Sequence, residues 1–234
     1  MTETSDLHTA RLNAALASGG ISHDVIYQTA LKNFSNPSPK RILDFGAGVG
    51  LFTTALAKVF PDAEVAGADI MQRPESLDER IGWITADLNG SIPVEDNYYD
   101  AIFSLEVIEH LENPRQFFRE LGRIVAPEGR VIVTTPNIRC VRSLVSFAFK
   151  GCFAHFDDSN YPAHITPLSP IDMSRAATEA GLEEAKLFFT DFGKMPKLVH
   201  QNWQDVPVVG RLFSGVFFSD TFGMEFRKPD LKRA

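Results

Sequence analysis

A glycine-rich turn that follows a short apolar run constrains the fold of this chain more than any other feature. The run is Ile42-Leu43, and after the turn the segment from Leu51 to Phe60 is apolar and free of interior proline or glycine. This pattern predicts a buried strand, a sharp turn and a helix that begins at the turn. Because a helix start offers free backbone N–H groups and partial positive charge, we expect a ligand there.

The spacing within the turn indicates which ligand is bound. A dinucleotide-binding turn reads G-x-G-x-x-G/A, whereas this one reads D-x-G-x-G-x-G, from Asp44 through Gly46, Gly48 and Gly50, with Leu51 where Gly or Ala should stand. A carboxylate repels a pyrophosphate but attracts an ammonium group. S-adenosylmethionine carries an ammonium, a sulfonium and no phosphate, so the turn favours it over NAD. The alternative is a strand-to-helix turn without a ligand.

Two further acids stand at the ends of predicted strands. The strand 63–70 ends at Asp69-Ile70, about 20 residues past the turn, where an acid accepts hydrogen bonds from ribose hydroxyls. The strand 81–88 ends at Asp87-Leu88. We expect Asp87 to accept from an adenine amine and Leu88 to pack on the adenine ring. A solvated acid at a strand end is the alternative for each.

The remaining pattern alternates strands and helices, which predicts an α/β fold with a doubly wound, Rossmann-like sheet of seven strands. The chain divides into a helical N-terminal extension, residues 1–36, broken near Gly19-Gly20, and a catalytic domain, residues 37–234. After the strand at Ile42-Leu43, the predicted strands are 63–70, 81–88, 99–105, 130–135, 185–190 and 221–227, with helices over 114–125 and 169–180 and a turn at 127–129.

Five segments, ILDFGAGVG, GADI, TADL, FSLEVIEHLENP and APEGRVIVTTPN, make residues 38–190 resemble the class I S-adenosylmethionine-dependent methyltransferases. The similarity is greatest to the bacterial subgroup with ubiquinone-pathway O-methyltransferases and methyltransferases of polysaccharide and natural-product clusters. The resemblance implies S-adenosylmethionine as cofactor and in-line O-methylation of a small or lipid-linked hydroxylated metabolite. By position it places Asp44, Gly46, Gly48 and Gly50 around the methionine part, Asp69 with Ile70 at the ribose, Asp87 and Leu88 at the adenine, and Leu105 and Glu106 beside the sulfonium.

The catalytic candidates follow the fourth and fifth strands or lie in the insertion after them. A hydroxyl acceptor must lose a proton, and histidine titrates near neutral pH. His110 is therefore our first candidate for the general base and His164 the second, with Glu106 beside the reacting methyl. N- or C-methylation, and a binding module that does not turn the cofactor over, are the alternative functions.

The sequence E-x-x-E-H could also hold a divalent cation. Glu106, Glu109 and His110 share one face of a helical turn, and His155 or His164 could complete the set. This spacing resembles the metal site of small-RNA 3′-end ribose methyltransferases. The alternative is that E-V-I-E-H-L is a turn common in the family the chain resembles, in which Glu106 lines the cofactor pocket, His110 is hydrogen-bonded and no metal binds; we therefore expect no essential metal. The acidic chain lacks an obvious basic face for RNA, so we also expect no nucleic-acid substrate.

The composition of the chain indicates which partners and which cellular compartment to expect. The 234 residues carry a formal net charge of −7, which argues against non-specific binding to nucleic acid or anionic membrane. The sequence has two cysteines, Cys140 and Cys152, and no stretch of signal-peptide or membrane-span character. We therefore expect reduced thiols and a cytoplasmic protein. The oligomeric state stays open, with a homodimer as one option.

Two irregular, aromatic segments follow the predicted core. The insertion 138–168 and the apolar segment 194–218 are expected to form a mobile cover that sets substrate choice. The alternative is a surface for a lipid-linked substrate, with peripheral contact to a membrane.

Overall fold

A computed structural model describes residues 2–196 and 198–230, and its centre is the predicted seven-stranded sheet. The strand order is β3-β2-β1-β4-β5-β9-β6, with β9 antiparallel to both its neighbours. The predicted α/β fold class is thereby confirmed. The strands are β1 (Arg41–Phe45), β2 (Glu64–Asp69), β3 (Gly82–Thr85), β4 (Tyr99–Leu105), β5 (Val125–Pro136), β6 (Glu183–Phe189) and β9 (Thr221–Arg227).

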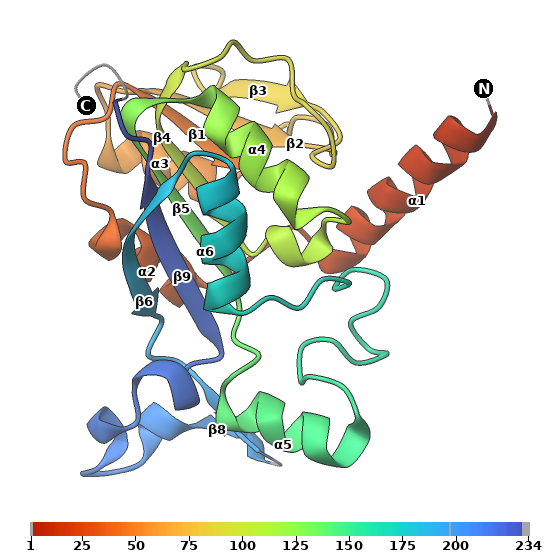
Figure 1. Cartoon of the computed structure of the whole chain (residues 1–234), viewed down its shortest axis with the longest axis vertical. Coiled ribbons are helices and arrows are strands. Elements are labelled where there is room, and N and C mark those ends of the chain that lie inside the picture. Colours follow the sequence, from red (N-terminus) through yellow and green to blue (C-terminus); the bar gives the residue numbers. More distant parts are fainter. Residues whose placement is uncertain (1, 197, 231–234) are drawn as a thin grey trace.

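Helices cover both faces of this sheet. Because successive strand residues point to opposite faces, Ile42 packs with α2 (Asp24–Asn33) and α3 (Leu51–Val59), while Leu43 packs with α4 (Pro114–Ile124) and α6 (Pro170–Glu179). Figure 1 shows α4 and α6 in front of the sheet. This layering leaves the carboxyl ends of the parallel strands free to carry a site.

The fifth strand is longer than predicted. It begins at Val125, which pairs with Tyr99, and continues past a bulge at the predicted turn, where Glu128 has a left-handed φ of 65°. At its far end Pro136 pairs with Thr221, the first residue of β9. Because β9 runs antiparallel, its start lies at the same edge as the carboxyl ends of the other strands.

A helix precedes the core. α1 (Thr2–Ser18) ends at Gly19 and Gly20, which both have positive φ, 76° and 59°. Gly20 packs directly on the glycine-rich turn, where a Cβ on Gly48 would lie 2.1 Å from the Gly20 carbonyl oxygen. Only glycine fits at position 48, so the end of α1 is fixed against the turn. Figure 1 shows the rest of α1 projecting from the body.

Of the segments predicted to cover the site, α5 (Val141–Lys150) and the later apolar segment lie at the lower end of the molecule, whereas the loop after α5 rises toward the base of α1 (Figure 1). The later segment contains a hairpin of β7 (Lys194–Met195) and β8 (Leu198–Asn202), which the sequence pattern did not predict. Three short 3-10 turns follow, at Trp203–Asp205, Gly210–Leu212 and Gly215–Phe217. Among the described residues, no helix has the length and apolar character needed to cross a bilayer.

Candidate active site

A cavity of about 870 Å³ opens at the carboxyl ends of the strands. Ligand pockets span about 300–1,000 Å³, so this cavity lies in the upper part of the range of small-molecule sites. Gly50 does not line it; its φ is 79° and its neighbour is Leu77, so it serves the turn alone. The other predicted site residues line the cavity: Asp44, Gly46, Gly48, Asp69, Ile70, Asp87, Leu88, Leu105, Glu106, His110 and His164.

Asp44, at the base of the turn, is buried and accepts a hydrogen bond of 2.6 Å from the Thr53 hydroxyl. Burial raises the pKa of Asp44 to about 7. A cation beside this carboxylate would favour its ionised form. The residue therefore fits the ammonium group of S-adenosylmethionine.

Asp69, at the end of β2, shapes the turn as well as facing the cavity. Its two carboxylate oxygens accept from the backbone N–H groups of Gly48, at 2.8 Å, and Met71, at 2.9 Å. Burial raises the pKa of Asp69, and these N–H groups oppose that rise. A substitution here would therefore disturb both the ribose position and the turn.

Asp87 carries an ion pair that the sequence pattern did not predict. Arg11, on α1, donates to Asp87 at 2.6 Å and holds Glu112 through two hydrogen bonds of 2.9 and 2.6 Å. Asn89 donates to the other Asp87 oxygen, at 3.0 Å. Any adenine amine would share this carboxylate with Arg11. No local pattern could reveal this contact, because 76 residues separate Arg11 from Asp87.

Two glutamates follow β4. Glu106 has a left-handed φ of 58°, and its carboxylate accepts from Thr134 at 3.0 Å. Glu109 is fully buried; its Oε2 accepts from Thr135 at 3.1 Å, and its Oε1 has no partner among the described residues. Burial raises the pKa of Glu109 to about 8. Burial, and then the charge of Glu109, raises the pKa of Glu106.

His110 is held in a defined tautomer. Its Nδ1 lies 2.7 Å from the carbonyl oxygen of Ala163, and a carbonyl only accepts, so Nδ1 carries the proton and Nε2 is the basic nitrogen. The ring of His164 lies 4.8 Å from the His110 ring, centroid to centroid, in an edge-on arrangement. Burial lowers the pKa of both rings, that of His164 to about 4.

Backbone hydrogen bonds hold these two histidines together. The N–H groups of Ile165 and Thr166 both donate to the carbonyl of Glu109, at 2.9 and 3.0 Å. The Thr166 hydroxyl donates to the carbonyl of Leu111 at 2.6 Å. The loop that carries His164 is therefore fixed to the turn that carries His110, and the two candidate bases lie in one place.

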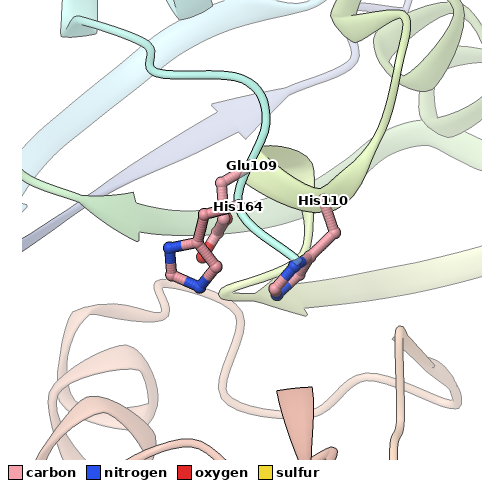
Figure 2. A group of neighbouring side chains, drawn as sticks. All are labelled: Glu109, His110 and His164. Atoms are coloured by element: carbon pink, nitrogen blue, oxygen red, sulfur yellow. The ribbon is translucent and has the colours of Figure 1, made fainter. Parts of the chain in front are cut away.

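Figure 2 shows Glu109, His110 and His164 pointing into a common space from two segments of the chain. One ligand atom of each lies within 4.8 Å of the others, and both Glu109 Oε1 and His164 Nδ1 lack hydrogen-bond partners among the described residues. A carboxylate and two imidazoles could hold a transition-metal ion. The same arrangement also serves a metal-free proton acceptor, and the absence of an essential metal stays a prediction.

Asp220 holds several groups together at the cover side of the cavity, and no sequence pattern indicated this role. Its carboxylate accepts from the Arg142 guanidinium at 3.1 Å, from the Lys194 backbone N–H at 3.1 Å and from the Cys140 thiol at 3.7 Å. Asp220 directly precedes the strand predicted at 221–227. That strand would have to be recognised as antiparallel before an acid at its start could be placed at the site edge.

Comparison with known proteins agrees with this geometry. A family profile described as a methyltransferase domain matches residues 23–187. The chain therefore belongs to the class I S-adenosylmethionine-dependent methyltransferases, as the resemblance of its motifs predicts, and its cofactor is S-adenosylmethionine. The division at residue 37 stays a prediction.

Curated relatives such as the two named below match about two fifths of this chain. The chain is 32% identical over 113 residues to the mitochondrial ubiquinone biosynthesis O-methyltransferase of Dictyostelium discoideum, covering 41% of this chain and 35% of that protein. It is 31% identical over 105 residues to the malonyl-[acyl-carrier protein] O-methyltransferase of Legionella pneumophila, covering 42% and 37%. These matches span little more than a third of each relative's length.

Solved structures share the fold at low identity. An S-adenosylmethionine-dependent methyltransferase from Mesorhizobium loti superposes with a TM-score of 0.60 and 15% identity, covering 87% of this chain and 97% of that one. The [4+2]-cyclase SpnF superposes with a TM-score of 0.62 and 17% identity, covering 97% and 94%. Because the second protein is named a cyclase, the fold alone does not establish the reaction.

Proposed function

We propose that this protein transfers a methyl group from S-adenosylmethionine to a hydroxyl of a small or lipid-linked metabolite. The observation that carries the proposal is the oriented imidazole of His110. Its Nδ1 proton is committed to the Ala163 carbonyl, which leaves Nε2 to accept a proton. His110 lines the same cavity as Leu105 and Glu106, the residues expected beside the sulfonium.

When bound, the cofactor supplies a methyl group already activated by its sulfonium. The protein must then align the acceptor oxygen and remove its proton. Burial lowers the pKa of His110, so its imidazole is neutral and basic at neutral pH. His164 packs edge-on against the His110 ring, and burial raises the pKa of the neighbouring Glu109, which favours its uncharged form.

The exposed apolar side chains of the cover support the proposal that the substrate is lipid-linked. Helix α5 of the cover exposes Phe147 and Phe149, with 51% and 85% of their surface accessible. The later segment exposes Val208 completely and 76% of Leu212. Apolar side chains in such numbers at one end of a molecule suit contact with a bilayer or a lipid tail. Co-sedimentation with vesicles of neutral phosphatidylcholine tests this, since Phe149→Ser should reduce binding.

The cytoplasmic location is part of the same proposal. Cys140 and Cys152 are both free thiols in the structure, which is the ordinary state in a reducing compartment. A thiol count on protein that is denatured in the presence of an alkylating agent, so that the buried Cys140 can also react, tests this expectation. Two alkylated cysteines per chain would support a reducing location, and an oxidised protein would contradict it.

The methylated atom is tested with S-adenosylmethionine carrying carbon-13 in its methyl group. Fractions of a cell extract are incubated with the protein, and the chemical shift of the labelled carbon distinguishes O-, N- and C-methyl products. We expect an O-methyl product that disappears with His110→Gln. An N- or C-methyl product would replace the proposed reaction, and no labelled product from any fraction would favour a binding module.

A further inference from the structure

We propose that the cover end of the cavity is an anion subsite, in which Arg142 and Lys194 bind a carboxylate or phosphate group of the acceptor substrate. The inference deepens the proposed function, on which it rests, by giving the substrate a chemical class. It comes from the distribution of charge inside the cavity. Both cationic residues line the cavity, together with His155 and Asp220.

Arg142 has donors left for a ligand. Its Nη1 donates to Asp220 at 3.1 Å and lies 3.2 Å from Nε2 of His155. These contacts use one corner of the guanidinium, and the side chain keeps 21% of its surface accessible. The fork of a guanidinium matches the two oxygens of a carboxylate or phosphate. An anionic group can therefore bind its remaining edge while the pair with Asp220 stays intact.

The negative charge of Asp220 does not balance this end of the cavity. Its carboxylate is shared by the Arg142 guanidinium, the Lys194 backbone N–H and the Cys140 thiol. The ammonium group of Lys194 has no hydrogen bond or ion pair within the described part of the chain. The single carboxylate of Asp220 can neutralise only one of the two cations. One uncompensated positive charge therefore faces the cavity.

The neighbouring titratable groups do not remove this excess. Asp157 also lines the cavity, but its carboxylate is held by Ser159 and Asn160 and lies 3.9 Å from the ammonium of Lys150. Burial, followed by the charge of Arg142, lowers the pKa of His155 to about 4, so this imidazole is neutral near pH 7. The cover end is thus net positive.

The opposite end of the cavity has the opposite character. Asp44 and Asp69 lie there, at the ends of β1 and β2, where the positively charged cofactor is expected. An acceptor that carries an anionic group would orient itself in this field, with its anion at Arg142 and Lys194 and its hydroxyl toward His110. A cationic acceptor would be repelled from the cover end.

The experiment uses four ligands with the same catechol head. They are 3-(3,4-dihydroxyphenyl)propanoate, its methyl ester, 2-(3,4-dihydroxyphenyl)ethyl phosphate and 2-(3,4-dihydroxyphenyl)ethanol. Each is titrated by calorimetry into the full chain saturated with S-adenosylhomocysteine. Lys194→Met removes one cation and keeps the backbone bond to Asp220, Arg142→Gln removes the other, and Arg139→Gln, at an exposed position of the same insertion, is the matched control.

We expect the carboxylate or the phosphate to bind at least about 10-fold more tightly than its neutral counterpart, as charge-assisted hydrogen bonds allow. Lys194→Met and Arg142→Gln should reduce that preference several-fold and leave the affinity for the neutral ligand within about twofold, whereas Arg139→Gln should change neither. Whether the carboxylate or the phosphate shows the larger preference identifies the natural group.

Equal affinities for charged and neutral ligands in the unmodified protein would overturn the subsite. Equal loss of both in the two variants would also overturn it, since Arg142 would then only fasten the cover through Asp220. Absence of measurable binding by either anion at millimolar concentration counts against it as well. O-methylation of a neutral hydroxyl compound without any preference for anions would leave the proposed function standing while this inference failed.

Discussion

The cofactor half of the cavity is built by the ends of neighbouring parallel strands, whereas the cover half is assembled from segments far apart in the chain. Asp44 and Asp69 stand at the ends of β1 and β2, which are paired in register. Arg142 and Asp220, by contrast, are separated by 78 residues. The two acids of the first half are thus positioned by the sheet itself, whereas the ion pair of the second half exists only when distant segments meet.

Because of this difference, we expect the two halves of the cavity to tolerate substitution to different degrees. The sheet edge fixes the positions of the acids and of the glycine-rich turn, so the residues of the cofactor site leave little freedom for substitution. The cover is attached through side chains such as Asn137, whose amide donates to the carbonyls of Val216 and Ser219, both at 2.8 Å. We therefore expect substitutions in the cover to change the acceptor without disturbing the cofactor.

The largest effect should come from His110, which lies between the two halves. His110→Gln removes the proton acceptor, so turnover should fall by about 10²–10⁴-fold with cofactor affinity within twofold. The unprotonated ring is the active form and burial lowers its pKa below 6.5. The contribution of His110 to kcat/KM, taken as the ratio between the unmodified protein and the variant, should therefore be full at neutral pH and be lost as the pH drops below the lowered pKa of His110.

The matched control for this variant is His8→Gln, at an exposed position of α1. It should leave turnover and the pH profile unchanged. Full activity of the His110 variant at every pH would show that His110 is not the general base, and His164 would then be the candidate.

A cofactor effect of intermediate size is expected at Asp69. Asp69→Ala removes an acceptor for the ribose and releases the N–H groups of Gly48 and Met71, so S-adenosylhomocysteine should bind more weakly by about 1–3 kcal/mol. Calorimetry compares the affinity of this variant for S-adenosylhomocysteine with that of Asp78→Ala. The latter removes an exposed carboxylate that pairs with Arg80. If both variants bind alike, Asp69 has no part in the ribose site.

A smaller effect should distinguish the inner from the outer surface of the cover. The ring of Phe156 lies 5.6 Å from the His164 ring, whereas Phe149 is 85% exposed. Phe156→Ala should raise the KM for the acceptor several-fold and leave cofactor affinity nearly unchanged. For a soluble acceptor, Phe149→Ala should change neither constant. Parallel loss of cofactor binding and activity in Phe156→Ala would mean that the cover belongs to the folded core.

The smallest effect is expected from removal of metal ions. Turnover should remain within about twofold after dialysis against a chelator, because His110 can act as a base without a metal. Initial rates before and after dialysis, with magnesium or manganese added back, provide the measurement. Loss of turnover that either ion restores would assign Glu109, His110 and His164 to a metal site.

The parts of the molecule that the sequence predicted are those specified by local spacing. The strand–turn–helix around Gly46 and the acid at the end of β2 repeat a short pattern, and the structure places both at one edge of the sheet. The start of β5 was missed because Pro127-Glu128-Gly129 has the composition of a turn. In the structure the backbone turns there through Glu128 and the strand pairing then resumes.

The parts that could not be predicted depend on contacts between distant residues. The partner of Asp87 is Arg11, on a helix whose position relative to the sheet no local pattern fixes. The β7–β8 hairpin forms within a segment that reads only as apolar and irregular. A hydrophobic pattern indicates that such segments are buried or exposed, but does not specify which charged groups they bring together.

The attachment of α1 closes one end of the cavity through contacts in which the cover takes no part. Arg11 fastens this helix across the adenine end through ion pairs with Asp87 and Glu112, and Gly19-Gly20 supplies the joint at its base. The cover closes the other end without these residues. Dissolved salt weakens partly exposed ion pairs, so we expect rising ionic strength to loosen α1 and to speed the exchange of a cofactor bound at this end of the cavity. The salt concentration of the surroundings would thereby set how long one cofactor molecule stays bound.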